Sequence, residues 1–281
     1  MFFFSPKLPI SDKERDWVDA SFETLIGLFG RERLGRIGGM GAAASGPGRS
    51  AVVLPSLDFF AREWEPTEAW ALFAVDQVCE MIGADRRRVD VRFFAVVSAD
   101  DALRESLPHW ESSGSKGPAG TYGELEEPTS LNPSSRGESE SSADVVRARI
   151  SLNADQLNDP TQLIATIAHE LAHLLLLGDR KIDRDIPDME PLTDLMTVFC
   201  GFGVFNANSA FNFQQWHSDA GRGGWKTNRL GYLPEPIWGY ALARYAFLLD
   251  DSRPRWMSSL KLNVRTYMQQ SMKVLVREGR R

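Results

Sequence analysis

Apolar positions recur along the chain at two different spacings, one typical of helices and one typical of strands. Residues 11–30 place apolar side chains three and four positions apart behind Ser11, a suitable N-cap residue, which predicts an amphipathic helix. Residues 67–83 show the same spacing. Residues 89–97 are rich in Val and Phe, and residues 144–152 alternate apolar and polar, so we expect a strand in each.

The longest helical pattern is nearly continuous in apolar residues. It covers residues 160–178, with Pro160 suited to the first turn and Gly178 suited to the end. A helix this apolar must be buried on most sides. His169, Glu170 and His173 interrupt it, and polar groups in such a helix need partners.

These three residues form the pattern His-Glu-Leu-Ala-His. Residues four apart share a face of a helix, so His169 and His173 can direct two imidazoles at one metal ion. Glu170 can face a bound water molecule as a general base. The spacing therefore predicts a zinc site on this helix.

A second pattern, Glu-Pro-Leu-Thr-Asp, follows at residues 190–194 and opens another apolar run. Pro191 suits the first turn of a helix, and Glu190 and Asp194 would share one face of it. Catalytic zinc keeps three protein ligands and one open position, so Glu190 is the predicted third ligand. Asp194 can accept the second ring N–H of a ligand histidine and fix its tautomer.

The two patterns together resemble the signature of the gluzincin metallopeptidases, the thermolysin-like group. The resemblance implies zinc bound by His169, His173 and Glu190, Glu170 as general base and Asp194 orienting a histidine. It covers residues 169–194 of 281, and the interval between His173 and Glu190 is shorter than in thermolysin itself.

The chain is also similar to a group of bacterial proteins that has no assigned activity. The similar segments are residues 169–173, 192–195, 201–208, 231–233 and 239–243. This second resemblance implies no reaction.

Other residues compete for the third ligand position and for the group that stabilises the oxyanion. The rival ligands are the loop aspartates Asp183, Asp185 and Asp188, and His217. In gluzincins a Tyr or His commonly steadies the tetrahedral intermediate, and the candidates for that role are His217, Tyr232 and Tyr240. The spacing does not choose among them.

Composition limits the function classes. A net charge of −6 gives no electrostatic argument for nucleic acid. Cys79 and Cys200 lie in apolar helical contexts and are expected to be buried thiols, which favours a reducing compartment. No secretory signal and no apolar run long enough for a bilayer is recognised, so we expect a cytoplasmic protein without membrane insertion. Its oligomeric state is not predicted.

The chain is expected to contain three segments. Residues 1–110 would supply helices and strands behind a sheet, residues 111–143 a disordered insertion rich in Ser, Gly, Pro and Glu, and residues 144–281 the zinc-binding core and C-terminal helices. The first and third segments could form one continuous domain. Residues 206–209, which include Asn206 and Asn208, resemble the end of a helix.

The sequence therefore favours an α+β, zincin-like fold with a small mixed sheet packed on the His-Glu-Leu-Ala-His helix. Residues 148–152 are expected to form an edge strand that pairs with extended substrate. The expected function is zinc-dependent hydrolysis of peptide bonds in a peptide or protein substrate. The alternatives are a non-catalytic metal-binding protein and a zinc hydrolase that acts on a non-peptide amide.

Overall fold

The computed structural model describes residues 7–35, 52–54, 64–95, 120–125, 147–178, 180–218 and 233–279, with only the backbone described for 125 and 211–218. Helices and strands both occur, so the α+β class is confirmed. The strands are β1 (Val89–Phe94), β2 (Gly120–Leu125) and β3 (Arg147–Asn153). The helices are α1 (Asp12–Phe29), α2 (Glu68–Ile82), α3 (Pro160–Leu177), α4 (Met189–Phe199), α5 (Gly203–Ser218), α6 (Glu235–Leu248) and α7 (Leu262–Glu278).

The three strands form a mixed sheet in the order β1-β3-β2. β1 runs parallel to β3, with Val91 opposite Ile150. β2 runs antiparallel to β3, with Tyr122 opposite the same Ile150. Ala148, Ile150 and Leu152 alternate along β3 and are fully buried, as the period of the sequence predicts.

Two expectations about this sheet are wrong. Residues 148–152 do not form an edge strand, because β3 is the central strand and is paired on both sides. Residues 120–125 lie inside the segment expected to be disordered, yet they form β2 at an edge of the sheet. The remaining residues of 111–143 lie outside the described part of the chain.

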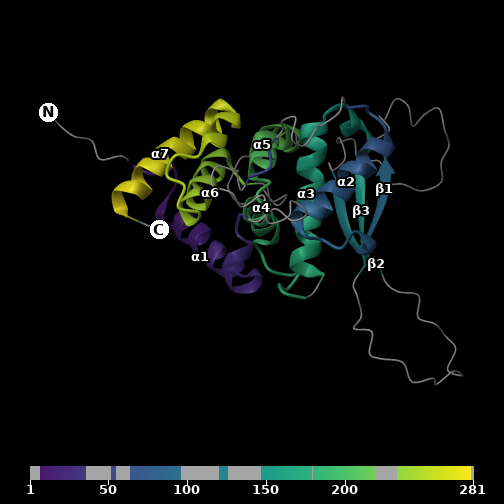
Figure 1. Ribbon diagram of the computed structural model, residues 1–281, viewed down its shortest axis with the longest axis horizontal. Helices are drawn as coiled ribbons and strands as arrows, with labels where there is room; N and C mark the ends of the chain where they lie inside the picture. Colours follow the sequence, from purple (N-terminus) through teal and green to yellow (C-terminus); the bar gives the residue numbers. More distant parts are fainter. Residues whose placement is uncertain are drawn as a thin grey trace, which may run out of the picture.

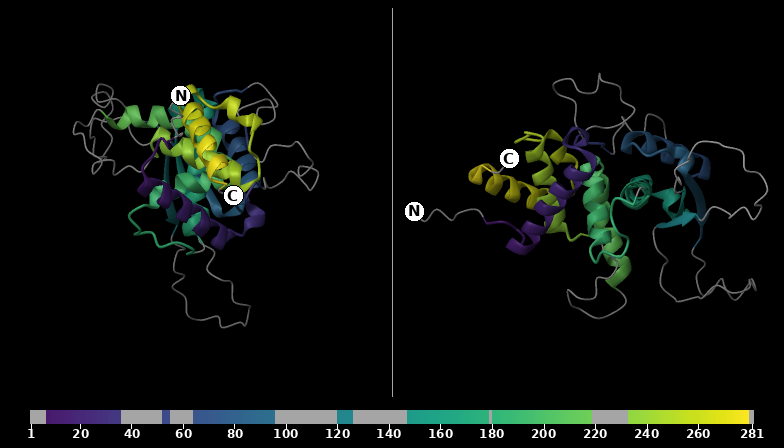
Figure 2. Two further views of the ribbon diagram at one scale, coloured as in Figure 1. Left: turned by 90° about the vertical axis from the view of Figure 1, so that its left-hand side faces the viewer. Right: turned by 90° about the horizontal axis from the view of Figure 1, so that it is seen from below.

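Helix α3 lies between the sheet and helices α4 and α5, and α2 packs against α3 at the end of the molecule that holds the sheet (Figures 1 and 2). Helix α3 contacts β2 and β3 on one side and α4 and α5 on the other. Helices α1, α6 and α7 lie at the opposite end of the molecule from the sheet, beyond α4. This position explains why α3 is apolar on nearly all sides, since 14 of its residues are buried.

Local signals in the sequence set the ends of the helices. Asp159 accepts a hydrogen bond from the backbone N–H of Gln162 at 3.0 Å, Pro160 follows in the first turn, and Gly178 ends α3. Ser11 caps α1 in a capping box. Thr67 caps α2 through the backbone N–H of Trp70. The predicted bounds of these three helices are confirmed within one residue.

Helix α5 replaces the helix end that we expected at residues 206–209. Asn206 is inside α5, and its side-chain amide donates to the carbonyl oxygen of Ala165 in α3 at 3.0 Å. Asn208 donates to the carbonyl oxygen of Ser259 at 2.9 Å. Both asparagines therefore fasten α5 to neighbouring segments.

Partly buried polar contacts join α1, near the start of the described chain, to α6 and α7, near its end. The Tyr240 hydroxyl of α6 donates to Asp19 Oδ1 of α1 at 2.9 Å, and the Arg244 guanidinium pairs with the same carboxylate at 3.0 Å. Arg15 of α1 pairs with Glu278 of α7. In the described part of the chain, no helix has the length and apolar character needed to cross a bilayer.

Candidate metal centre

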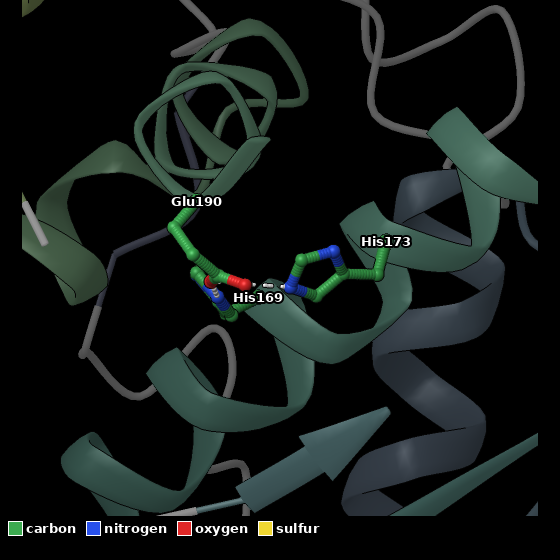
Figure 3. Close-up of side chains that lie close together, drawn as sticks. All are labelled: His169, His173 and Glu190. Atoms are coloured by element: carbon green, nitrogen blue, oxygen red, sulfur yellow. Dashed lines mark hydrogen bonds and ion pairs between the residues drawn. The ribbon is translucent and has the colours of Figure 1, made fainter. Parts of the chain in front are cut away.

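Three side chains converge between α3 and α4. Both histidines project from α3 one turn apart, and Glu190 reaches them from the first turn of α4 (Figure 3). Their ligand atoms all lie within 4.8 Å of one another, so this group could hold a metal ion. The side chains of His169 and His173 are 6% and 8% exposed, whereas that of Glu190 is 42% exposed. The group is therefore closed on the histidine side and open to solvent on the glutamate side.

The distances from Glu190 to the two histidines are close to those between the ligands of a small tetrahedral metal. Glu190 Oε2 lies 3.0 Å from His169 Nε2 and 3.3 Å from His173 Nε2. Ligands about 2.1 Å from a tetrahedral zinc ion lie about 3.4 Å from one another. Two imidazole nitrogens and one carboxylate oxygen also form a donor set that suits such a metal. The residues present therefore fit a bound metal.

Asp194 contacts the nitrogen of the His169 ring that does not face Glu190. Its Oδ1 lies 3.0 Å from His169 Nδ1, and its Oδ2 accepts a hydrogen bond from the backbone N–H of Leu233 at 2.9 Å. In a metal-loaded site, a proton kept on Nδ1 by Asp194 would leave the lone pair of Nε2 for the ion. Asp194 thus occupies the place that the sequence predicted for it, and the structure adds which histidine it contacts.

Two residues beside His173 were not found from the sequence. Thr193 Oγ1 lies 3.2 Å from His173 Nδ1. The ring of Tyr122 in β2 stacks on the His173 ring at 5.6 Å with an interplanar angle of 30°. Thr193 stands three residues after Glu190, a spacing that could have indicated a shared face of α4. Nothing in the sequence places Tyr122 here, because its segment looked disordered.

Glu170 is buried on α3 next to the first ligand. It lines a small cavity together with His169, Asp194 and Asn206. Burial raises the pKa of Glu170 to about 7, and the nearby Glu190 carboxylate adds to this while His169 opposes it. A carboxyl group with a pKa near neutral can both accept and release a proton.

Burial and mutual hydrogen bonds shift the pKa values of His169, His173 and Glu190. Burial alone would lower the pKa of His169, but hydrogen bonds to Asp194 and Glu190 raise it well above its usual range. Burial lowers the pKa of His173. Burial opposes ionisation of Glu190, yet hydrogen bonds to both histidines hold its pKa far below the usual range. The charged carboxylate form of Glu190 is therefore favoured, which suits a candidate metal ligand.

The rival candidates lie elsewhere or beyond the described residues. Asp188 accepts a hydrogen bond from Trp17 at 3.2 Å, and Asp183 accepts one from the backbone of Asp185 at 3.0 Å. Neither belongs to the converging group. The Tyr240 hydroxyl is already bound to Asp19. Tyr232 and the side chain of His217 lie outside the described residues.

No protein-family model, no curated protein and no solved structure matches this chain. The resemblance to gluzincins is therefore carried by the two short patterns and by the convergence of the residues within them.

Proposed function

We propose that this protein is a zinc-dependent hydrolase with a zincin-like fold that cleaves peptide bonds. The observation that carries the proposal is the partly open group of His169, His173 and Glu190 with a buried acid, Glu170, beside it. A structural zinc site is closed by four protein ligands, whereas a catalytic one keeps a position open. The described part of the chain offers three ligands and exposes Glu190 to solvent.

Each residue of the site has a distinct task in this reaction. Bound zinc would lower the pKa of a water molecule to about 7 and polarise the scissile carbonyl group. Glu170 accepts a proton from the attacking water and delivers it to the leaving amine, which its near-neutral pKa allows. Asp194 keeps His169 in the tautomer that ligates through Nε2.

The position of β2 supports a peptide as the substrate. One edge of β2 pairs with β3, and its other edge pairs with no strand in the described part of the chain. Such an edge can bind an extended peptide through backbone hydrogen bonds. β2 begins at Gly120, close to Glu170 Oε1, so a peptide along this edge would pass the general base.

The metal content of purified protein tests the site. We expect about one zinc ion per chain in the wild type, measured by elemental mass spectrometry, and loss of zinc in both His169→Ala and Glu190→Ala. Asp185→Ala is a matched control, since Asp185 is exposed and lies outside the ligand group, and it should keep its zinc.

Two results would contradict this assignment. Absence of zinc from the wild type, even after reconstitution, would remove the basis for a hydrolase. Zinc retained by Glu190→Ala and lost from Asp185→Ala would move the third ligand into the loop. A peptide-library cleavage screen on the zinc-loaded protein then tests the peptidase activity, and cleavage of a non-peptide amide alone would change the substrate class.

Gly120 is expected to be intolerant of a side chain. A Cβ atom there would lie 2.6 Å from Thr166 Cγ2 and 2.9 Å from Glu170 Oε1. Gly120→Ala should therefore displace Glu170 or β2 and lower kcat by about tenfold or more, as small misplacements at a reacting centre do. Gly123→Ala on the same strand is the control, because its Cβ would meet nothing within 4 Å. Equal activity of the two variants would show that β2 does not constrain Glu170.

A further inference from the structure

Thr193 is a fully buried hydroxyl that contacts a predicted metal ligand from behind. Its side chain is 0% exposed, and its Oγ1 lies 3.2 Å from His173 Nδ1. The same oxygen lies 2.8 Å from the carbonyl oxygen of Met189, one turn earlier in α4. A carbonyl oxygen can only accept, and a hydroxyl has one proton to donate.

These two contacts fix the direction of the bond to His173. With its proton directed at Met189, the Thr193 oxygen presents a lone pair to Nδ1 and must accept from it. Nδ1 then carries the ring proton, so that in the metal-loaded site Nε2 could give its lone pair to the ion in place of its contact with Glu190. We propose that Thr193 is a positioning residue that holds His173 in the metal-ligating tautomer. This inference rests on the proposed zinc site.

Three side chains on one face of α4 contribute to the candidate metal centre. Glu190, Thr193 and Asp194 are spaced i, i+3 and i+4, so all three side chains face α3. Glu190 supplies a ligand, Asp194 holds His169 and Thr193 holds His173. One helix therefore supplies a ligand and orients both of the others.

The two histidines are held by partners of different charge. His169 bonds to a carboxylate, which makes its ring a stronger donor to a metal, whereas His173 bonds to a neutral hydroxyl. The stacked ring of Tyr122 limits rotation of His173 but offers its Nδ1 no acceptor. Thr193 is thus the group that selects the tautomer of His173.

The experiment compares Thr193→Val with Thr193→Ser and Thr197→Val. Valine keeps the shape of threonine and removes the hydroxyl, and serine restores it. Thr197 is the matched control because it is equally buried on α4 and its hydroxyl donates to a backbone carbonyl oxygen, that of Asp194, at 2.7 Å. Zinc affinity is measured by competition with a chromophoric chelator. We expect Thr193→Val to bind zinc about 10–100-fold more weakly than wild type, with Thr193→Ser and Thr197→Val close to wild type.

A spectroscopic measurement separates positioning from loss of packing. In the zinc-loaded wild type, nitrogen-15 NMR should show slowly exchanging Nδ1 protons on both ligand histidines. Thr193→Val should lose the slow exchange of the His173 signal and keep that of His169, whereas Thr197→Val should keep both.

The outcomes distinguish a failure of this inference from a failure of the proposed zinc-dependent function. If wild type binds no zinc, the proposed function fails and the inference fails with it. If wild type binds zinc and Thr193→Val binds it equally well, only the inference is overturned. Equal weakening by Thr193→Val and Thr197→Val would also overturn it, because loss of helix packing would then explain both.

Discussion

Replacing Glu170 with glutamine is expected to abolish peptide hydrolysis while zinc stays bound. The amide has nearly the same shape as the carboxyl group but cannot accept a proton from water at neutral pH. General base catalysis contributes about 10²–10⁴-fold, so kcat should fall by that factor in Glu170→Gln. The measurement is the cleavage rate of a peptide found in the library screen, with zinc content determined on the same sample.

Glu170→Asp serves as the comparison for this variant. It retains the acid but shortens the side chain, so its activity should lie between those of wild type and Glu170→Gln. Full activity in a zinc-loaded Glu170→Gln protein would exclude Glu170 as the base. Loss of zinc from that variant would instead place Glu170 among the groups that maintain the ligand cluster.

Gly239→Ala is expected to give the largest loss of stability for the smallest chemical change. Gly239 lies where α6 meets α7, and an added Cβ would stand 2.8 Å from the backbone nitrogen of Met268 and closer still to Tyr267 Cβ. Backbone atoms cannot move without shifting the helix. Overpacking of this kind costs about 1–3 kcal/mol, which urea denaturation should show as a lower midpoint.

Gly27→Ala is expected to raise the stability of the protein in the same urea denaturation measurement. Gly27 is inside α1, is exposed, and has nothing within 4 Å of its would-be Cβ. Alanine there should stabilise the protein by about 0.5–1 kcal/mol, because it lowers the entropy of the unfolded chain. If Gly239→Ala stabilises the protein as Gly27→Ala does, then α6 and α7 are not in close contact at Gly239.

The helices near the candidate site could be predicted because their signals are local. Pro160 and Gly178 stand at the ends of α3, and Pro191 stands in the first turn of α4. The approach of Glu190 to the two histidines followed from a motif with fixed spacing. In each case the information lies within one or two turns of helix, which sequence patterns describe well.

The parts that could not be predicted depend on contacts between distant segments. β2 has few apolar residues, and its strand conformation comes from pairing with β3, whose partner residues are 22–32 positions away. The contact of Thr193 with His173 depends on how α4 is rotated against α3, which no single helix pattern defines. Strand order has the same origin, so the central place of β3 could not be read from its alternation.

All three candidate ligands lie within residues 169–190, and this has a consequence for the order of folding. Bringing His173 to Glu190 closes a short loop, whereas pairing Asp90 with Arg149 closes one more than three times as long. The difference in closure entropy is about 1 kcal/mol in favour of the ligand pair. Helices α3 and α4 can therefore associate, and bring the candidate ligands together, before β1 pairs with β3. By the same measure β2, whose partners in β3 are 22–32 residues away, would add to β3 early, and β1 would be the last strand to join the sheet.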